Sequence, residues 1–96
     1  MDKLYNDDVR GLFEAILSLE NLDECYNFFT DALTTKEIQD IAQRLKAAKM
    51  LSAGRSYLDV GIETGMSTAT ISRVSKALEH GAGGYKTVLA RLNNKK

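Results

Sequence analysis

A chain of 96 residues, 44% of them hydrophobic and 27% charged, is long enough for one domain and too short for two independent cores. It contains no proline, and its apolar residues recur with the helical period, which predicts an all-α fold with residues 1–96 as a single domain. The net charge is zero, and Cys25, the only cysteine, excludes an intramolecular disulfide.

The N-terminal segment MDKLYNDDVR is polar and acidic, which is not the pattern of a secretory signal peptide. No apolar run reaches the roughly 20 residues that a membrane-spanning helix needs. A single cysteine also suits a reducing compartment. We therefore expect a cytoplasmic protein that does not contact a membrane.

Two amphipathic helices are expected in the first third of the chain. The first is capped at Asp7 or Asp8, and the second spans about Leu22 to Leu33. The apolar face of the second helix is wide for so short a protein, and it could be covered by a second copy of the chain or by the third helix. The apolar residues of the first helix are Val9, Leu12, Phe13, Ile16 and Leu17, and those of the second are Leu22, Cys25, Tyr26, Phe28, Phe29 and Leu33.

The third predicted helix has a capping box at its start. Thr34 and Glu37 stand three residues apart, so each side chain can bond to a backbone N–H of the first turn. The apolar pattern continues to about Ser52, and Gly54 then suits the left-handed conformation that ends a helix. The apolar positions of this helix are Ile38, Ile41, Ala42, Leu45, Ala48 and Leu51.

A helix-turn-helix is predicted over residues 57–76. Its first helix is capped by Ser56 and covers residues 57–64, and its second helix begins at Ser67 or Thr68. Such a motif places its second helix in the major groove of DNA, so the pattern predicts DNA binding.

Two glycines have steric roles in this motif. Gly61 is its fifth residue, at the point where the two helices cross, and only a small residue is expected to fit there. Gly65 is its ninth, in the turn, where a positive φ is required. The positions expected to face the shared core are Val60, Thr64, Met66, Ile71 and Val74.

The exposed face of the second helix of the motif combines small and basic side chains. Small residues allow close approach to base edges, with apolar contact to thymine methyl groups or readout through water. The N-terminus of the first helix could bind a backbone phosphate. The alternative at each position is an ordinary solvated helix face. The candidate DNA-binding residues are Ser56, Tyr57, Ser67, Thr68, Ala69, Ser72, Arg73 and Lys76.

A last short helix is expected after the flexible tract Gly81–Gly84, over about Tyr85 to Leu92, before a basic tail. The only histidine, His80, has no cysteine or carboxylate cluster at metal spacing, and no nucleophile motif accompanies it. We therefore expect neither a metal site nor an enzyme.

The zero net charge conceals two halves of opposite sign. Residues 1–42 hold three basic and ten acidic residues, a net charge of −7, and residues 43–96 hold ten basic and three acidic residues, a net charge of +7. A polyanion would be attracted to the second half. Alternatively, the two halves pair with each other or with a second subunit, and charge alone does not decide between these interpretations.

Three short motifs, Leu33-Thr34, Ile41-Ala42-Gln43-Arg44 and Ala69-Thr70-Ile71-Ser72-Arg73, resemble those of the Trp repressor family, especially its YerC/YecD branch. The resemblance covers about Leu33 to Leu92. It implies a six-helix subunit that forms an intertwined homodimer and binds a palindromic operator in double-stranded DNA through two recognition helices.

The resemblance also implies how the chain is divided. Residues 1–52 would supply the dimerisation helices, residues 53–80 the helix-turn-helix and residues 84–93 the C-terminal helix. The family's DNA-contacting positions map onto Thr68, Ala69 and Ser72.

Effector binding in the family uses two arginines that sandwich an indole, and they correspond to Arg44 and Arg73. A pair of guanidinium groups can stack on an aromatic ring and bind a carboxylate. The sequence departs from the family at Val74, where the family has glycine, and at Ala77, where it has a serine that helps to hold the ligand's amino group. We therefore expect no cofactor, and a small-molecule co-repressor, if one is used, to differ from tryptophan. Arg44 and Arg73 could instead contact phosphates, form intrachain salt bridges or bind a different ligand.

The resulting prediction is a sequence-specific transcriptional regulator, a repressor by analogy with the family, that binds DNA as a homodimer. The alternative is a helical dimeric protein-interaction module that has kept the fold without binding DNA.

Overall fold

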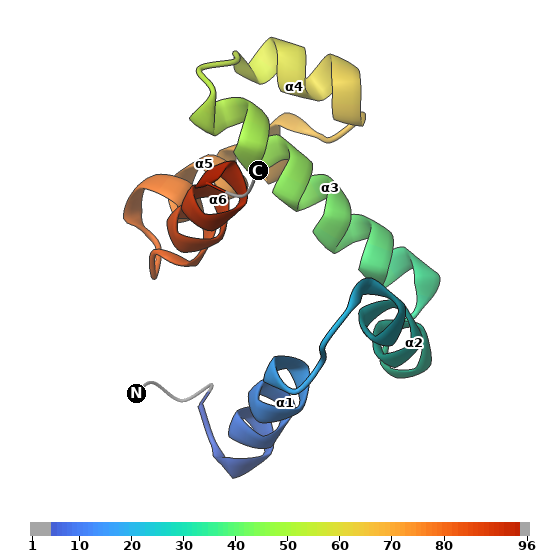
Figure 1. Cartoon of the computed structure of the whole chain (residues 1–96). Helices are drawn as coiled ribbons and strands as arrows, with labels where there is room; N and C mark the ends of the chain where they lie inside the picture. The colour runs from blue at the N-terminus through green and yellow to red at the C-terminus, as the bar shows by residue number, and fades with distance from the viewer. Residues whose placement is uncertain (1–4, 95–96) are drawn as a thin grey trace. The chain divides into compact units, whose positions relative to one another are not determined.

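The computed structural model describes residues 5–94, and the elements in this range are all helices (Figure 1). The expected all-α class is confirmed. Within these residues no helix is both long and apolar enough to cross a membrane. Residues 1–4, at the start of the segment compared with a signal peptide, and the tail residues Lys95 and Lys96 lie outside the described part. The helices are α1 (Asp7–Leu17), α2 (Leu22–Ala32), α3 (Thr35–Ser52), α4 (Tyr57–Thr64), α5 (Thr68–His80) and α6 (Gly84–Asn94).

The chain forms two compact units, Met1–Ile38 and Gln39–Lys96. In the first unit, α1 begins one or two residues earlier than expected, because Asn6 and not Asp7 or Asp8 is the N-cap. The backbone N–H of Val9 donates to Asn6 Oδ1 at 2.9 Å. Asn caps a helix as well as Asp does, and both aspartates then lie in the first turn, where their charge favours the helix dipole.

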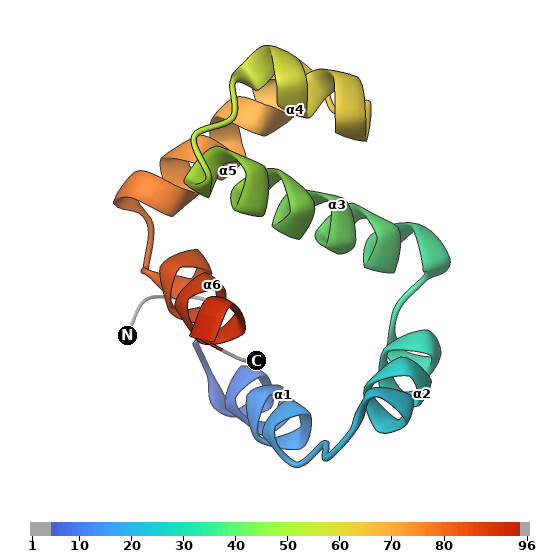
Figure 2. The same cartoon turned by 45° about the horizontal axis from the view of Figure 1, so that its top comes forward.

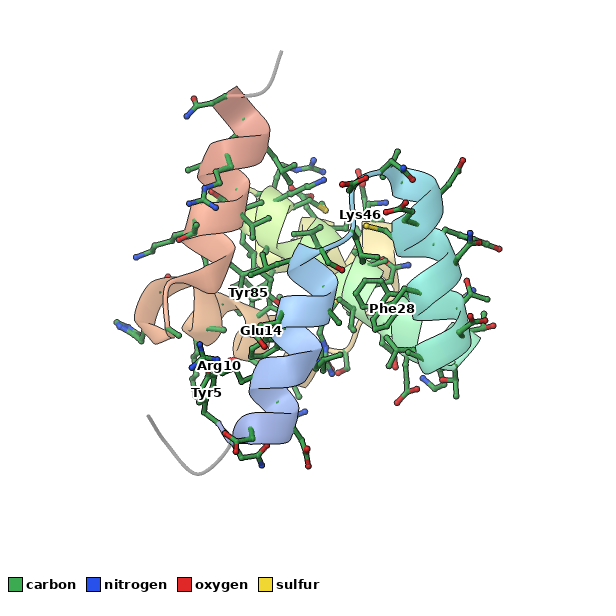
Figure 3. The ribbon with its side chains drawn as sticks, turned by 60° about the horizontal axis from the view of Figure 1, so that its bottom comes forward. Tyr5, Arg10, Glu14, Phe28, Lys46 and Tyr85 are labelled. Atoms are coloured by element: carbon green, nitrogen blue, oxygen red, sulfur yellow. The ribbon has the colours of Figure 1, made fainter. Side chains whose placement is uncertain are left out.

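Neither α1 nor α2 contains a buried residue. Leu17 is 83% exposed and Leu22 is 86% exposed, although both belong to predicted apolar faces. The polar side of α1 carries an ion pair between Arg10 Nε and Glu14 Oε2 at 3.4 Å (Figure 3). The rings of Phe28 and Phe29 in α2 meet edge to face, with their centroids 5.5 Å apart.

The capping box at the start of α3 is confirmed. The Glu37 backbone N–H donates to Thr34 Oγ1 at 3.1 Å, and the Thr34 backbone N–H donates to Glu37 Oε1 at 2.9 Å. At the other end Gly54 has a φ of +88°, as expected for a left-handed helix end. The Arg55 N–H donates to the Met50 carbonyl at 3.0 Å and closes the turn.

The core of the second unit lies between the C-terminal half of α3 and the last three helices (Figure 2). The predicted apolar pattern of α3 was partly wrong, because Ile41 is 55% exposed, whereas Ala47 and Met50 are buried. Two small alanines in succession, Ala47 and Ala48, let the other helices approach α3 closely. The buried core residues are Ala47, Ala48, Met50, Val60, Ile71, Val74 and Leu89.

Candidate DNA interface

The turn between α4 and α5 has the conformation that the sequence predicted. Gly65 ends α4 with a φ of +72°. Thr64 then fixes the turn, because its hydroxyl donates to the Val60 carbonyl at 2.6 Å and accepts from the Met66 N–H at 3.1 Å. The expected core-facing residues divide into Val60, Ile71 and Val74, which are buried, and Thr64 and Met66, which are partly buried.

Gly61 is less constrained than expected. A Cβ atom at this position would lie 3.7 Å from Ile71 Cδ1 and 3.9 Å from the Met66 carbonyl oxygen, both ordinary contact distances. The crossing of the two helices therefore leaves room for the methyl group of an alanine, and a glycine is not required there.

Both helices of the motif begin at a serine cap. Ser56 Oγ accepts from the Asp59 N–H at 3.1 Å, and Ser67 Oγ accepts from the Thr70 N–H at 3.2 Å. The Ser67 hydroxyl also shares a 3.0 Å hydrogen bond with Thr70 Oγ1. These bonds hold the N-terminal turns of α4 and α5, where the unpaired N–H groups of a helix can face an anion.

The predicted DNA-contacting residues of α5 lie on one face of the helix, since they are spaced i, i+1, i+4, i+5 and i+8 from Thr68. Ser72 is partly buried, and the others are exposed, as are Ser56 and Tyr57 at the start of α4. The face therefore presents hydroxyl and methyl groups at its N-terminal end and two cations further along. The exposed members on α5 are Ser67, Thr68, Ala69, Arg73 and Lys76.

An ion-pair network joins α3, the loop after it and α4. Arg55 Nε lies 3.3 Å from Asp59 Oδ2, and Arg55 Nη2 lies 3.3 Å from Glu63 Oε1. Lys46 Nζ of α3 lies 3.9 Å from Glu63 Oε2. The hydrogen bond to Asp59, followed by that to Glu63, raises the pKa of Arg55 above its ordinary value. Its charge is shared by two carboxylates, which makes Arg55 less available to a phosphate.

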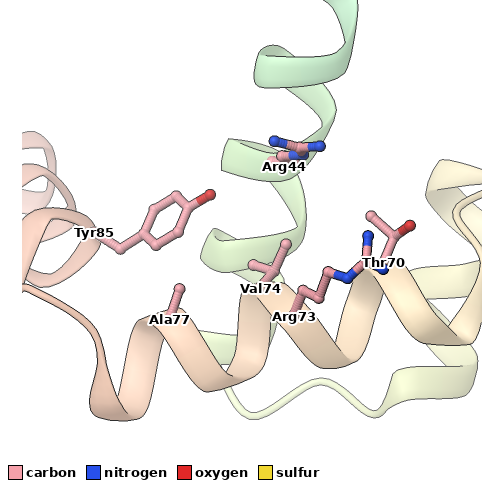
Figure 4. Close-up of a pocket in the computed structure, with 6 residues that line it drawn as sticks. All are labelled: Arg44, Thr70, Arg73, Val74, Ala77 and Tyr85. Atoms are coloured by element: carbon pink, nitrogen blue, oxygen red, sulfur yellow. The ribbon is translucent and has the colours of Figure 1, made fainter. Parts of the chain in front are cut away.

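A second site lies between α3, α5 and α6 and shares Arg73 with the DNA-contacting face. It is a pocket of about 180 Å³ (Figure 4), and it brings together all four residues predicted for an effector pocket. Among the described residues Arg44 and Arg73 make no ion pair. The predicted lining residues Arg44, Arg73, Val74 and Ala77 are joined by Thr70 and Tyr85.

Of the two added residues, Thr70 could have been predicted from the sequence and Tyr85 could not. Thr70 precedes Arg73, Val74 and Ala77 on α5 by three, four and seven residues, so helical periodicity places it on the same face. Tyr85 belongs to α6, beyond the glycine tract, and its ring points into the pocket toward Arg44 (Figure 4). No periodicity relates Tyr85 to α5. Within the described residues no group of three potential ligands is arranged to hold a metal ion.

Comparison with known protein families finds one that spans nearly the whole chain, the Trp repressor protein family, which matches residues 7–93. The chain belongs to the Trp repressor family. The uncharacterised protein YerC of Bacillus subtilis is 49% identical to it over 92 residues, which cover 96% of this chain and 88% of that protein.

Two solved structures show that the six-helix fold is that of Trp repressor-like proteins. A TrpR-like protein from Eubacterium eligens is 50% identical, with a TM-score of 0.91, over 98% of this chain and 97% of that chain. A candidate Trp repressor from Staphylococcus aureus is 47% identical, with a TM-score of 0.90, over 98% of this chain and 94% of that chain.

The two residues at which the sequence departs from the tryptophan-binding pattern, Val74 and Ala77, both line the pocket. Val74 is buried at 3% exposure and also lines the pocket, so its isopropyl group occupies space that a glycine would leave open. Ala77 contributes a methyl group to the same wall, where it offers no hydrogen bond.

Proposed function

We propose that this protein is a sequence-specific DNA-binding transcriptional regulator that binds a palindromic operator as an intertwined homodimer. The observation that carries the proposal is the exposed face of α5, with its small residues at the N-terminal end and Arg73 and Lys76 further along. A recognition helix reads bases with its N-terminal residues. Membership of the Trp repressor family supports the same role. It also supports a function in binding and not in catalysis, and an effect on transcription that is repression.

The roles of the residues on this face follow from their chemistry. Thr68, Ala69 and Ser72 are short enough to bring α5 close to the base edges, where methyl groups contact thymine and hydroxyls bond directly or through water. Arg73 and Lys76 bind a guanine or a phosphate. The capped first turn of α4, at Ser56 and Tyr57, supplies backbone N–H groups to a phosphate.

The homodimer is supported by the apolar faces of the first two helices. Leu12 and Phe13 of α1 and Leu22 and Tyr26 of α2 are exposed, and neither helix has a buried residue. A second copy of the chain would cover such faces, and a shared core adds stability that a chain of this size lacks alone.

We further propose that the pocket between Arg44 and Arg73 binds a small molecule with a carboxylate, and that this molecule differs from tryptophan. The two guanidinium groups without ion pairs provide the anion contact. Val74 and Ala77 remove the space and the hydrogen bond that tryptophan binding in the family uses.

The test is selection of genomic DNA fragments by the purified protein at low salt, with and without a panel of amino acids. We expect specific fragments to be retained and their affinity to fall steeply with salt. Charge reversal, Lys76→Glu, should weaken binding to all fragments. A bulky substitution, Ala69→Phe, should change which sequences are preferred.

Failure to retain any fragment at low salt would replace this proposal with that of a dimeric protein-interaction module. Retention that no amino acid in the panel changes would leave the DNA-binding proposal and remove these amino acids as effectors. A fragment retained best with tryptophan would contradict the interpretation of Val74 and Ala77.

A further inference from the structure

The pocket between α3, α5 and α6 is lined by two cations and by no acidic side chain. In Figure 4 Arg44 of α3 and Tyr85 of α6 lie opposite α5, which supplies Arg73. Among the described residues neither guanidinium group is held in an ion pair. Each can therefore bind a carboxylate through two parallel N–H groups. Because one carboxylate fills one such fork, two forks on different helices favour a ligand with two carboxylates.

The remaining polar side chains of the pocket are the hydroxyls of Thr70 and Tyr85. A hydroxyl can donate to a carboxylate oxygen, so both add to the anion contact. An ammonium group would meet no carboxylate among the lining side chains, and both guanidinium groups would repel it. Ala77, in the same wall, offers it no hydrogen bond. The lining thus selects against an amino acid and for a ligand that has no amino group.

The volume of the pocket limits the size of this ligand. A cavity of about 150 Å³ holds one benzene molecule, and the pocket has about 180 Å³. It therefore accommodates little more than the atoms of one six-membered ring. A dicarboxylate with a short carbon chain has this size, whereas an indole with an amino-acid side chain is larger.

The pocket is connected to the candidate DNA-contacting face at two points. Arg73 is exposed and belongs to both sites. The hydroxyl of Thr70 shares a 3.0 Å hydrogen bond with that of Ser67, which caps α5. A guanidinium group that binds a ligand carboxylate is less available to a phosphate, and the two negative charges of a dicarboxylate repel the DNA backbone. Ligand and DNA should therefore oppose each other's binding.

We propose that the pocket binds a small dicarboxylate without an amino group, and that the bound dicarboxylate weakens binding to DNA. This rests on the proposed function, and it adds to the effector site described there the class of the ligand and the direction of its effect. A ligand of this kind is an inducer, which releases the operator, and not a co-repressor, which strengthens binding to it.

The class of ligand is tested by isothermal titration calorimetry of the free protein with a matched series of probes. Succinate and glutarate are the dicarboxylates, and the second reaches across a wider separation of the two guanidinium groups. Butyrate lacks one carboxylate of succinate, aspartate is succinate with an amino group, and inorganic phosphate carries its charge on a single centre. We expect one of the dicarboxylates to bind at least about tenfold more tightly than butyrate, aspartate or phosphate, since each of these leaves a group of the pocket unpaired or repelled.

The direction of the effect is tested by titrating a labelled DNA fragment, taken from those that the protein selects, and following fluorescence anisotropy. The tighter-binding dicarboxylate is added to saturation, and sodium chloride keeps the ionic strength constant, because salt alone weakens DNA binding. We expect the affinity for the fragment to fall about tenfold. By linkage, saturating DNA should weaken binding of the dicarboxylate by the same factor.

Two variants assign this effect to the pocket. Arg44→Gln removes one of the two forks, and Tyr85→Phe removes a hydroxyl but keeps the ring. The quantity compared is the ratio of the DNA affinities without and with the dicarboxylate, so that a change in DNA affinity itself cancels. Arg44→Gln should reduce this ratio to less than about twofold, and Tyr85→Phe to an intermediate value. Lys49→Gln is the matched control, because it removes an exposed cation of α3 that does not line the pocket and should keep the full ratio.

Binding of neither dicarboxylate, or equally tight binding of aspartate, butyrate or phosphate, would overturn the assigned ligand class. Tighter DNA binding in the presence of the dicarboxylate would reverse the direction and make the ligand a co-repressor. A ratio that stays at about tenfold in Arg44→Gln would show that the dicarboxylate acts at another site. Absence of DNA binding by the wild type without any ligand would instead remove the proposed function, and calorimetry would still decide the class of ligand.

Discussion

Gly61 and Gly65 lie four residues apart in the helix-turn-helix, and the structure gives them different constraints. Gly65 has a φ of +72°, a conformation that side chains with a Cβ rarely adopt. Gly61 lies within α4, and a Cβ there would meet only van der Waals neighbours. The constraint at position 65 comes from the backbone, whereas at position 61 the space available decides what is tolerated.

We therefore expect Gly65→Ala to destabilise the fold and Gly61→Ala to leave it unchanged or more stable. A left-handed alanine costs about 1 kcal/mol, which lowers the Tm of a domain of this size by about 4–8 °C. Alanine in place of glycine within a helix gains up to about 1 kcal/mol. Thermal unfolding followed by circular dichroism measures both changes. Equal losses in the two variants would show that the motif is also closely packed at position 61.

The residues of the candidate effector pocket show what sequence reasoning can and cannot predict at this scale. Arg44, Arg73, Val74 and Ala77 were predicted together, from a family resemblance, and they line one pocket. Thr70 was within reach of the same reasoning. Tyr85 was not, because its position depends on how the Gly81–Gly84 turn directs α6 back across α5, and no local pattern encodes that direction.

At the scale of the elements, the helix bounds were well predicted wherever a cap fixes them. Ser56 and Ser67 determine where α4 and α5 begin, through bonds to backbone N–H groups that a short-range pattern can identify. The start of α1 was misplaced because Asn6, Asp7 and Asp8 are all good caps, and only the backbone conformation selects one. The buried side of α3 was partly misassigned because Ile41 fits the apolar period and is nevertheless exposed, and because alanine occurs both at an exposed position, Ala42, and at a buried one, Ala47.

The capping box of α3 gives a prediction for one element. Thr34→Ala removes the acceptor of the Glu37 N–H and should lower the free energy of unfolding by about 1 kcal/mol. Thr34→Ser keeps a hydroxyl at the same position and should restore most of this loss. Chemical denaturation of the two variants and the wild type measures the effect. A loss shared equally by serine would show that the threonine methyl group, and not the cap, is responsible.

The Arg55 network gives a second prediction for an element. Glu63→Gln removes one carboxylate shared by Arg55 and Lys46, so both cations become more available to DNA. We expect weaker attachment of α4 to α3, seen as a slightly lower Tm, together with tighter non-specific DNA binding at low salt. The plot of log affinity against log salt should steepen by about 0.9 for each phosphate contact that is gained. An unchanged slope would show that neither cation reaches a phosphate.

The pH dependence of this network follows from the raised pKa of Arg55. A basic group with a raised pKa in the folded state stabilises the protein below its unfolded pKa and loses this effect only as the pH rises through the folded value. For arginine both values lie far above neutral pH. The contribution of Arg55 should therefore stay constant between pH 6 and pH 9, and salt should be the variable that weakens it.

At the scale of the whole molecule, the charge division coincides with the division of the proposed roles. The half that carries α4, α5 and α6 is basic and holds the candidate DNA face, whereas the half that carries α1 and α2 is acidic and exposes apolar faces. A polyanion is thus attracted to one part of the chain and repelled by the other. The acidic part remains available for a contact that DNA does not compete for, which is consistent with a role in dimerisation.

Dimerisation makes a prediction for the wild-type protein. If folding and association are coupled, the Tm depends on concentration. A tenfold increase in concentration changes the stability by about 1.4 kcal/mol, and for two chains together this raises the Tm by about 2–4 °C. Calorimetry at several concentrations, with the molar mass from light scattering, measures the coupling. A constant Tm and a molar mass of 10.6 kDa would contradict the homodimer.

The variant Phe13→Ala locates the interface. The ring is 47% exposed in the single chain, so its removal should cost a monomer little, whereas a ring covered by a second copy costs about 3–5 kcal/mol. Leu58→Asn is the matched control, since Leu58 is more exposed than Phe13 but lies on α4, outside the proposed dimer core. A large loss for Phe13→Ala with none for Leu58→Asn would assign the dimer core to the acidic half. Equal small losses would leave the apolar face of α1 without a partner and contradict the intertwined arrangement.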